Sequence, residues 1–336
     1  MKNITILGAG SWGSAIAIHL SKKNYNINLW MRSKEQKEKI QRTKENIKYL
    51  PGIVFSSSIN LFNDIEKSIK DADVIVLAVP SQQVRNILMK LEDKATKDQV
   101  FVDLAKGLEK ESNKRLSTVF KEILPNNKYI ALSGPSHAEE VAKDLPTTLV
   151  CAGEDEITRE YIQEIFTSPK LRVYTNEDLI GVELGGAFKN IIAFGVGIID
   201  GLGYGDNTKA ALMTRGIKEI TRLGVKMGAN VETFAGLSGI GDLIVTCTSK
   251  HSRNRKAGYL IGKGYSLEQT LEEVNMVVEG IVATNVAYNL SKIYDISMPI
   301  TEEIYNVLYE NKDVKESVID LMMRPKKHET EDGLNL

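Results

Sequence analysis

The first half of the chain alternates short β-branched segments with segments of helical periodicity, and this alternation limits the fold more than any other feature. Residues 74–79, VIVLAV, form a continuous apolar run, as expected of a central parallel strand that is covered on both faces. We predict further strands at Asn3–Leu7, Asn26–Met31, Val100–Leu104, Tyr129–Leu132, Thr147–Ala152 and Leu171–Tyr174. We predict helices between them at Trp12–Lys23, Lys34–Thr43, Gln82–Leu91 and Asp155–Phe166. This order predicts a doubly wound, mostly parallel sheet of the α/β class.

The second half of the chain shows mainly helical periodicity. Residues 181–200 are rich in Gly and Ala and apolar nearly all round, which predicts a buried helix whose glycines permit close approach of its neighbours. Further helices are predicted at Asn207–Met227, Arg255–Lys263, Leu267–Val274, Ile281–Tyr294 and Pro299–Val307. We therefore expect an α/β domain over residues 1–178, an all-α domain over residues 179–324 and a flexible charged tail over residues 325–336.

Length, charge and composition argue against several classes of function. A chain of 336 residues suits two domains, and a net charge of −1 offers no basic field for nucleic acid. We find neither an apolar run long enough to span a bilayer nor a leader before the first strand, so we expect a cytoplasmic protein without membrane insertion. Two distant cysteines and four histidines without ligand spacing predict no metal site.

The glycine-rich motif GAGSWG, residues 8–13, follows the first predicted strand and opens a helix. Gly8 suits a tight turn, Gly10 lets the backbone approach a pyrophosphate, and Gly13 lets the helix pack against the strand. The N–H groups and dipole at the helix start favour phosphate. The motif alone also fits a glycine-rich turn without a ligand, but its strand–turn–helix context favours a Rossmann domain that binds a dinucleotide.

Arg32 follows the second predicted strand, where NAD-specific domains usually place an Asp or Glu. An arginine here can lie on the adenine or pair with a 2′-phosphate, so NADPH fits the sequence alongside NADH. A solvated surface arginine is the alternative interpretation.

Two polar segments follow predicted strands of the sheet. They are residues 105–109, AKGLE, and residues 133–140, SGPSHAEE. Ligands of open α/β sheets bind beyond the carboxyl ends of the strands. We therefore expect both segments to face a bound cofactor.

In the helical half, Lys189 stands inside an otherwise apolar, glycine-rich helix. Burial of an unpaired ammonium is costly, so such a lysine usually has a partner or a lowered pKa and can act as a general acid or base. A lysine whose head reaches water fits the spacing nearly as well. Ser252, Arg253 and Asn254 lie just before a predicted helix, an arrangement that suits an anion but also an N-cap followed by surface charge.

Taken together, these segments resemble the NAD(P)-dependent glycerol-3-phosphate dehydrogenases of the bacterial type. The resemblance covers residues 3 to about 321 and rests on GAGSWG, KGLE, GPSHAEEVA, GAFKN, GDLIVTCTSKHSRN and VVEG, in the family's order. It implies a Rossmann domain followed by a helical substrate domain. It also implies reversible reduction of dihydroxyacetone phosphate to sn-glycerol 3-phosphate with NADPH or NADH, the product supplying the backbone for glycerophospholipid synthesis.

The resemblance also implies roles for individual residues. Lys189 matches the catalytic proton acceptor. The substrate positions are Lys106, Gly134, Ser136, Lys189, Asp242, Ser252, Arg253 and Asn254. The cofactor positions are Gly8, Gly10, Ser11, Trp12, Gly13, Arg32, Tyr49, Lys106, Ala138, Arg253, Val277 and Glu279. His137 and Phe188 depart from the family's usual Phe and Leu, and each replaces one bulky side chain with another, so the departures concern local packing more than chemistry.

In the mechanism that we hypothesise, Lys189 transfers the proton. The like charge of Lys106 lowers the pKa of Lys189, and Asp242 holds either Lys189 or a substrate hydroxyl. Two other functions fit the sequence. One is that of another two-domain NAD(P)-dependent hydroxy-acid dehydrogenase, which has no clear need of the Ser252–Asn254 cluster. The other is that of a non-catalytic NAD(P) sensor, which needs no buried lysine. The sequence leaves a homodimer, feedback inhibition and the choice between NADH and NADPH open.

Overall fold

The computed structural model describes residues 1–329, so most of the predicted flexible tail over residues 325–336 lies outside the described residues. The chain forms two compact units. The first contains Met1–Ala105 and Leu116–Leu179, and the second contains Lys106–Arg115 and the chain from Ile180 onward. The ten residues from Lys106 to Arg115 therefore belong with the second unit, although α/β sequence flanks them on both sides.

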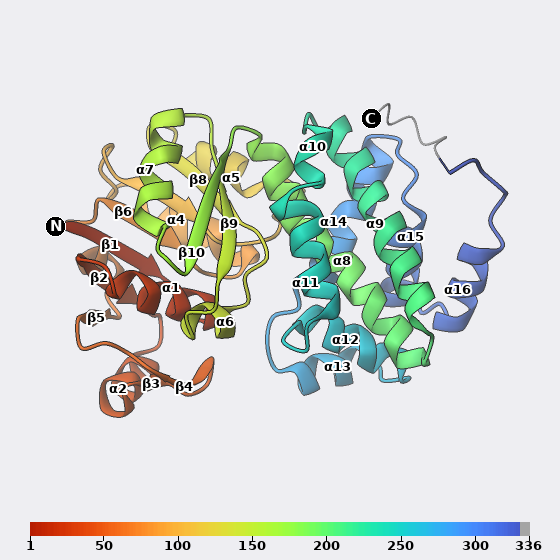
Figure 1. Cartoon of the computed structure of the whole chain (residues 1–336), viewed down its shortest axis with the longest axis horizontal. Helices are drawn as coiled ribbons and strands as arrows, with labels where there is room; N and C mark the ends of the chain where they lie inside the picture. Colours follow the sequence, from red (N-terminus) through yellow and green to blue (C-terminus); the bar gives the residue numbers. More distant parts are fainter. Residues whose placement is uncertain (330–336) are drawn as a thin grey trace. The chain divides into compact units, whose positions relative to one another are not determined.

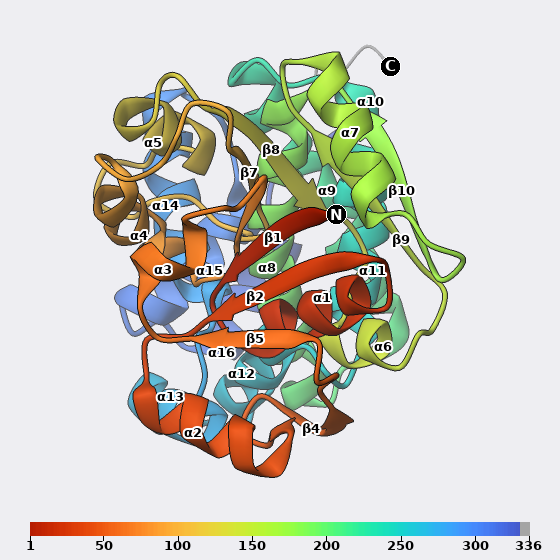
Figure 2. The ribbon, with the colours of Figure 1, turned by 90° about the vertical axis from the view of Figure 1, so that its left-hand side faces the viewer.

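An eight-stranded sheet forms the centre of the first unit (Figure 2). Its strands are β1 Lys2–Leu7, β2 Tyr25–Trp30, β5 Ile59–Phe62, β6 Val74–Leu77, β7 Val100–Asp103, β8 Lys128–Ser133, β9 Thr147–Ala152 and β10 Leu171–Asn176. The order is β10-β9-β8-β7-β6-β1-β2-β5, and of the adjacent pairs only β8–β9 is antiparallel. The prediction of a mostly parallel sheet is confirmed, with β10 at one edge, β9 beside it and β5 at the other edge.

Helices connect the strands of this sheet. They are α1 Ser11–Ser21, α2 Lys34–Thr43, α3 Ile65–Ile69, η1 Ser81–Gln83, α4 Val84–Leu91, α5 Leu116–Ile123, α6 Ala138–Ala142 and α7 Glu156–Phe166. A separate hairpin of β3 Glu45–Asn46 and β4 Leu50–Val54 follows α2. The hairpin and β5, α3, α5 and α6 were not predicted, since most are too short to show a clear period.

The core of the first unit lies on both faces of the central strands. All four residues of β6 are buried, which is why that strand reads as an unbroken apolar run rather than an alternating one. Ile4, Ile6 and Leu7 of β1 are fully buried as well. Each such side chain stabilises the fold by roughly 1.5–3 kcal/mol through its removal from water.

The second unit is helical, as predicted, and Figure 1 shows its main helices side by side. They are α8 Leu179–Leu202, α9 Asp206–Lys226, α10 Val231–Phe234, η2 Leu237–Gly241, α11 Asp242–Thr248, α12 Arg253–Gly262, α13 Leu267–Val274, α14 Glu279–Ile293, α15 Pro299–Tyr309 and α16 Val314–Met322. The short elements α10, η2, α11 and α16 were not predicted.

Helix α8 is the core helix of this unit and corrects one prediction. By length and composition it is apolar enough to cross a membrane, so the statement that the chain has no such run was wrong. Its apolar window is 94% buried inside the structure, as in the core helix of a soluble protein. The glycines of α8 permit close packing as expected, because a Cβ on Gly197 would lie 2.1 Å from the carbonyl oxygen of Arg255 of α12.

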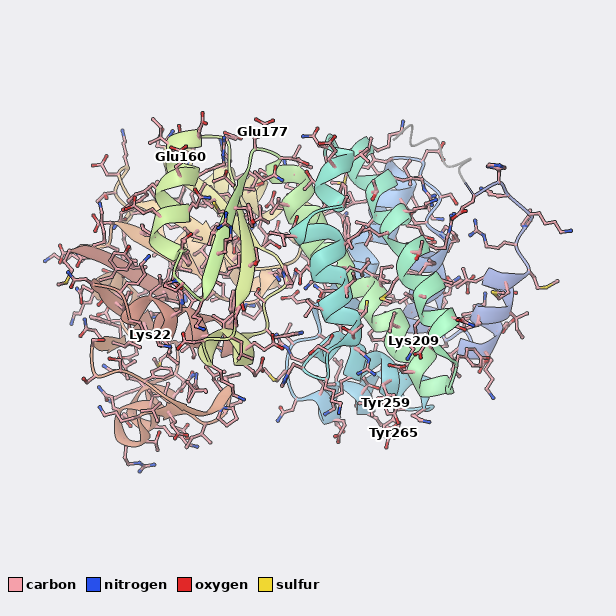
Figure 3. All side chains as sticks on the ribbon, viewed as in Figure 1. Lys22, Glu160, Glu177, Lys209, Tyr259 and Tyr265 are labelled. Carbon is pink, nitrogen blue, oxygen red and sulfur yellow. The ribbon has the colours of Figure 1, made fainter. Side chains whose placement is uncertain are left out.

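An ion-pair network ties three helices of the second unit together. Asp200 of α8 accepts from Arg255 Nε of α12 at 2.8 Å and lies 3.0 Å from Lys209 Nζ of α9. Figure 3 labels Lys209, the member of this network on α9. These ion pairs hold the C-terminal end of α8 against α9 and α12.

Candidate active site

The turn after β1 has the backbone geometry that its glycines predicted. Gly8 has φ +124°, and a Cβ there would lie 2.4 Å from the carbonyl oxygen of Ala78. A Cβ on Gly13 would lie 1.9 Å from the carbonyl oxygen of Gly8, so only glycine lets α1 pack this close to the strand. Both positions therefore exclude larger residues for reasons within the fold itself.

Gly10 differs from these two glycines, because a Cβ on it would have no atom within 4 Å. The glycine is the N-cap of α1, and no side chain caps the N–H groups of that helix. Open space beside a bare backbone at the start of an 11-residue helix suits the approach of a pyrophosphate. The residues present therefore fit a dinucleotide cofactor.

Two further predicted cofactor residues meet beside this turn. Ser11 Oγ donates to the backbone oxygen of Tyr49 at 2.6 Å. Asn46, which was not predicted, is buried and donates to the Ala9 oxygen and to Ser14 Oγ, each at 2.8 Å. These bonds attach the β3–β4 hairpin to the turn. Trp12 packs partly buried against the core, and Arg32 is exposed after β2.

The segment after β8 gives the first unit a second polar turn. Gly134 has φ +123°, and Ser136 Oγ donates to its carbonyl oxygen at 3.1 Å. Ala138 begins α6. Ser133 Oγ is buried and has no hydrogen-bond partner within residues 1–329. Because β8 runs parallel to β7, β6 and β1, this turn lies at the carboxyl edge of the sheet, where the glycine turn also lies.

In the second unit, Lys189 of α8 is buried and paired. Its Nζ donates to the carboxylate of Asp242 and to Thr246 Oγ1, the latter at 2.6 Å. Thr246 lies one turn after Asp242 on α11, and its hydroxyl donates to the Asp242 backbone oxygen at 2.6 Å. The amine is thus held by two groups from one short helix, and the interpretation of Lys189 as a lysine with its head in water was wrong.

Lys106 joins the same carboxylate from the segment that packs with the second unit. Its Nζ lies 2.7 Å from Asp242 Oδ2, while Lys189 occupies Oδ1. Asp242 is 1% exposed and bridges the two ammonium groups. The sequence left open whether Asp242 holds Lys189 or a substrate hydroxyl; in this structure it holds both lysines.

The surroundings bring the proton equilibrium of Lys189 near neutrality. Burial, the largest cause, lowers the pKa of Lys189 from 10.5 to about 7. The Asp242 carboxylate opposes this shift, and the like charge of Lys106 adds to it. The hypothesis that Lys106 lowers this pKa was right in direction, but burial contributes more. A group with this pKa can give and take a proton at neutral pH.

Ser252, Arg253 and Asn254 lie at the start of α12 rather than before it. Ser252 is the N-cap, and its Oγ accepts from the Arg255 N–H at 3.2 Å, so the helix begins two residues earlier than predicted. Arg253 is exposed and Asn254 is buried.

The predicted residues Val277 and Glu279 lie at the start of α14. Val277 is exposed in the loop before this helix, and Glu279 is its first residue. The N–H of the next residue, Gly280, donates to Asn254 Oδ1 at 2.9 Å. This bond brings the start of α14 against the start of α12.

The structure gathers the predicted residues in two groups, one in each unit. The first unit holds Gly8, Gly10, Ser11, Trp12, Gly13, Arg32, Tyr49, Gly134, Ser136 and Ala138. The second holds Lys106, Lys189, Asp242, Ser252, Arg253, Asn254, Val277 and Glu279. Across residues 1–329, no group of three or more His, Cys, Asp or Glu side chains could hold a metal ion.

Neither Thr246 nor Asn190 was among the site residues predicted from the sequence. The signal for Thr246 was its spacing of four residues from Asp242, which places both on one helix face once α11 is known to be a helix. The signal for Asn190 was its place in the GAFKN motif, directly after Lys189.

Comparisons with known proteins agree along the whole chain. A family model described as NAD-dependent glycerol-3-phosphate dehydrogenase N-terminus matches residues 3–158, and its C-terminus counterpart matches residues 178–319. A glycerol-3-phosphate dehydrogenase [NAD(P)+] from Clostridium tetani is 52% identical and covers 98% of this chain and 94% of its own. The counterpart from a Thermoanaerobacter species is 54% identical, over 97% of this chain and 98% of its own.

Solved structures separate the shared fold from the shared family. Glycerol-3-phosphate dehydrogenase from Coxiella burnetii has a TM-score of 0.93 at 34% identity, covering 96% of this chain and 99% of its own. A D-mandelate dehydrogenase, with a TM-score of 0.64 at 14% identity, covers 92% of this chain and 97% of its own and shares the fold alone. The sequence matches and the first of these structures together show that the chain belongs to the NAD(P)-dependent glycerol-3-phosphate dehydrogenase family.

Proposed function

We propose that this protein reduces dihydroxyacetone phosphate to sn-glycerol 3-phosphate, reversibly, with NADPH or NADH. The observation that carries the proposal is the buried Lys189 amine, which Asp242 and Thr246 hold and whose pKa lies at about 7. Reduction of a ketone to an alcohol needs a proton donor at the carbonyl oxygen, and the reverse reaction needs an acceptor there. The relatives named above carry this activity in their names.

Lys189 performs the proton transfer in this proposal. The bound cofactor supplies the hydride and would be held at the Gly8–Gly13 turn. Of the three N–H groups of the Lys189 ammonium, two donate to Asp242 and Thr246, which leaves one for the oxygen on C2 of the substrate. As negative charge develops on that oxygen, the ammonium donates its proton. In the reverse direction the neutral amine takes the proton of the hydroxyl.

The other polar groups of the second unit bind and orient the substrate. Lys106 adds a second positive charge beside Asp242, and the Asn254 amide supplies a donor that helps to polarise the carbonyl. Ser252 and the exposed Arg253 at the start of α12 suit the phosphate of the substrate, and Arg253 also suits the cofactor. A chain with a net charge of only −1 needs such local cations to attract a dianion.

The first unit binds the cofactor. Arg32, exposed after β2, can pair with the 2′-phosphate of NADPH or lie on the adenine of either cofactor. We further propose a cytoplasmic enzyme that works without a metal and supplies the glycerol phosphate backbone of phospholipids. This function needs neither a nucleic acid nor insertion into a membrane, and it is compatible with a homodimer.

Steady-state kinetics test the proposal. The purified protein is mixed with NADPH or NADH and then with dihydroxyacetone phosphate, 2-oxopantoate or another 2-oxo acid, and cofactor absorbance is followed. We expect oxidation with dihydroxyacetone phosphate alone and the reverse reaction with sn-glycerol 3-phosphate. Turnover of a 2-oxo acid in its place would establish the hydroxy-acid dehydrogenase. Cofactor binding without turnover of any substrate would establish the sensor.

A further inference from the structure

We propose that Asn190 is a positioning residue that acts through Asn254, in concert with the backbone N–H of Gly280. The inference rests on the proposed function, in which the Asn254 amide donates to the substrate. Asn190 and Gly280 fix which way this amide faces and hold it on the helix that carries Lys189. Neither residue was among the site residues expected from the sequence.

The hydrogen bond from Gly280 determines the orientation of the Asn254 amide. A backbone N–H can only donate, so the atom of Asn254 that lies 2.9 Å from the Gly280 nitrogen is the oxygen, Oδ1. The amide nitrogen, Nδ2, therefore faces the other way, where it donates to Asn190 Oδ1 at 2.8 Å. The two bonds together leave one orientation of this side chain, because a flipped amide would set donor against donor at Gly280 and acceptor against acceptor at Asn190.

Close packing holds these three residues in place. A Cβ on Gly280 would lie 2.6 Å from the backbone oxygen of Asn190 and 3.1 Å from Asn254 Oδ1, so α14 begins directly against both residues. Asn190 and Asn254 are each more than nine-tenths buried. In such an environment an amide that loses its partner cannot replace it with bulk water, so the hydrogen-bond chain resists rearrangement.

The chain matters for the reaction because of its position next to Lys189. Asn190 follows Lys189 directly on α8, so one helix carries both the proton-transfer group and the anchor of the Asn254 amide. The hydrogen bond to Asn190 uses one of the two N–H groups on Asn254 Nδ2. We expect the second N–H to donate a hydrogen bond to an oxygen of the substrate. Loss of the hydrogen bond to Asn190 would let the Asn254 amide rotate, and its second N–H would no longer point in one direction.

A double-mutant cycle separates a positioning role from a purely structural one. We would measure kcat and KM for dihydroxyacetone phosphate in Asn190→Ala, Asn254→Ala and the double variant, together with KM for NADPH and thermal stability. Asn190→Ala should lower kcat/KM for dihydroxyacetone phosphate by about tenfold, the equivalent of one hydrogen bond. Since Asn190 acts through Asn254, the double variant should be no slower than Asn254→Ala by more than about twofold.

Matched variants sharpen this test. Asn190→Asp keeps an acceptor oxygen towards Asn254 Nδ2 and should recover part of the activity that Asn190→Ala loses. Thr221→Val removes a buried hydroxyl whose only bond in the structure described is to Ile217 O within α9, and it should leave kcat/KM unchanged. If Asn190→Ala does not fold, Asn190→Ser replaces it in the cycle, because the shorter side chain cannot reach Asn254.

Three results would overturn the inference. One is near-normal kcat/KM in Asn190→Ala. Another is a double variant in which the two losses multiply, which would mean that Asn190 acts independently of Asn254. The third is near-normal activity in Asn254→Ala, which leaves nothing for Asn190 to act through. The first two results leave the proposed function as it stands. The third would also remove the role proposed for Asn254, but not the proposed activity, which is tested by turnover of the unmodified enzyme.

Discussion

The acid–base behaviour of Lys189 follows from its burial more than from its charged neighbours. Because its pKa lies at about 7 rather than 10.5, both protonation states are populated near neutral pH. We predict that kcat/KM for ketone reduction, which needs the ammonium, falls as pH rises through about 7. The kcat/KM for alcohol oxidation, which needs the amine, should fall as pH decreases through the same value. Kinetics in both directions between about pH 5 and pH 9, roughly two units either side of that pKa, measure this.

Opposite slopes with a shared midpoint are the signature of one group that serves both directions. A midpoint above about 9 in both profiles would mean that Lys189 titrates as an ordinary exposed lysine. Such a result would contradict the link between burial and proton transfer that is proposed here.

Lys106 tests the smaller, electrostatic part of the same effect. Its positive charge lowers the pKa of Lys189 by direct repulsion, so Lys106→Met should move the midpoint of the reduction profile to higher pH. The variant should also lower kcat/KM for dihydroxyacetone phosphate, since a substrate contact is lost. Lys97→Met, which removes an exposed lysine of the first unit, is the control and should leave the midpoint unchanged. A downward shift in Lys106→Met would show that the two ammonium groups do not repel each other.

At the scale of the helices, Glu219 shows how a buried carboxyl can replace an ordinary cap. Glu219 of α9 accepts from the N–H groups of Ile300 and Thr301 in the first turn of α15, at 2.8 and 3.2 Å. Burial raises its pKa from 4.5 to about 7, although these two N–H groups oppose the shift. Met298, the N-cap residue of α15, makes no side-chain cap, so this carboxyl satisfies donors that would otherwise lack partners.

The raised pKa of Glu219 predicts a stability that depends on pH. Between pH 4.5 and about 7 the folded state binds a proton that the unfolded state has released, so the free energy of unfolding falls as pH rises across this window. Relative to Glu219→Gln, which cannot titrate, the wild-type protein should lose up to about 3 kcal/mol between these limits. Urea unfolding of both proteins at pH 5 and pH 7.5 checks this. A difference between them that is constant with pH would mean that the carboxyl stays ionised in the folded state.

The length of the repeating sequence pattern separates the elements that were predicted from those that were not. Long periodic segments such as α8, α9 and α14 and the buried strand β6 were recognised because one pattern repeats over their whole length. Helix α11, which carries Asp242 and Thr246, was not recognised. Its sequence, DLIVTCT, is rich in β-branched residues of low helix propensity, and packing within the second unit decides its conformation.

For the whole molecule, chain order and spatial grouping differ at one place that matters for the chemistry. The segment from Lys106 to Arg115 follows β7 and precedes α5, yet it packs with the helical unit. Leu108 joins the core of that unit, and Arg115 Nη1 lies 2.6 Å from Glu183 Oε2 of α8. The order of strands and helices could not reveal this, because it depends on contacts between residues far apart in sequence.

The same limit applies to the candidate site. Family motifs named Lys106, Lys189, Asp242 and Asn254 from the sequence, but not the bonds among them. Asn254 meets Asn190 across 64 residues and Gly280 across 26, and those distances in the chain carry no local pattern. The residue types pointed to the chemistry, whereas the orientation of each group became visible only in three dimensions.

Turnover by Lys189→Ala tests the central claim most directly, with binding of NADPH and thermal stability measured on the same sample. If this amine transfers the proton, the variant should stay folded, bind NADPH as the wild-type protein does and lose at least about a hundredfold in kcat for dihydroxyacetone phosphate. A folded variant that reduces dihydroxyacetone phosphate at a rate close to wild type would remove Lys189 from the reaction.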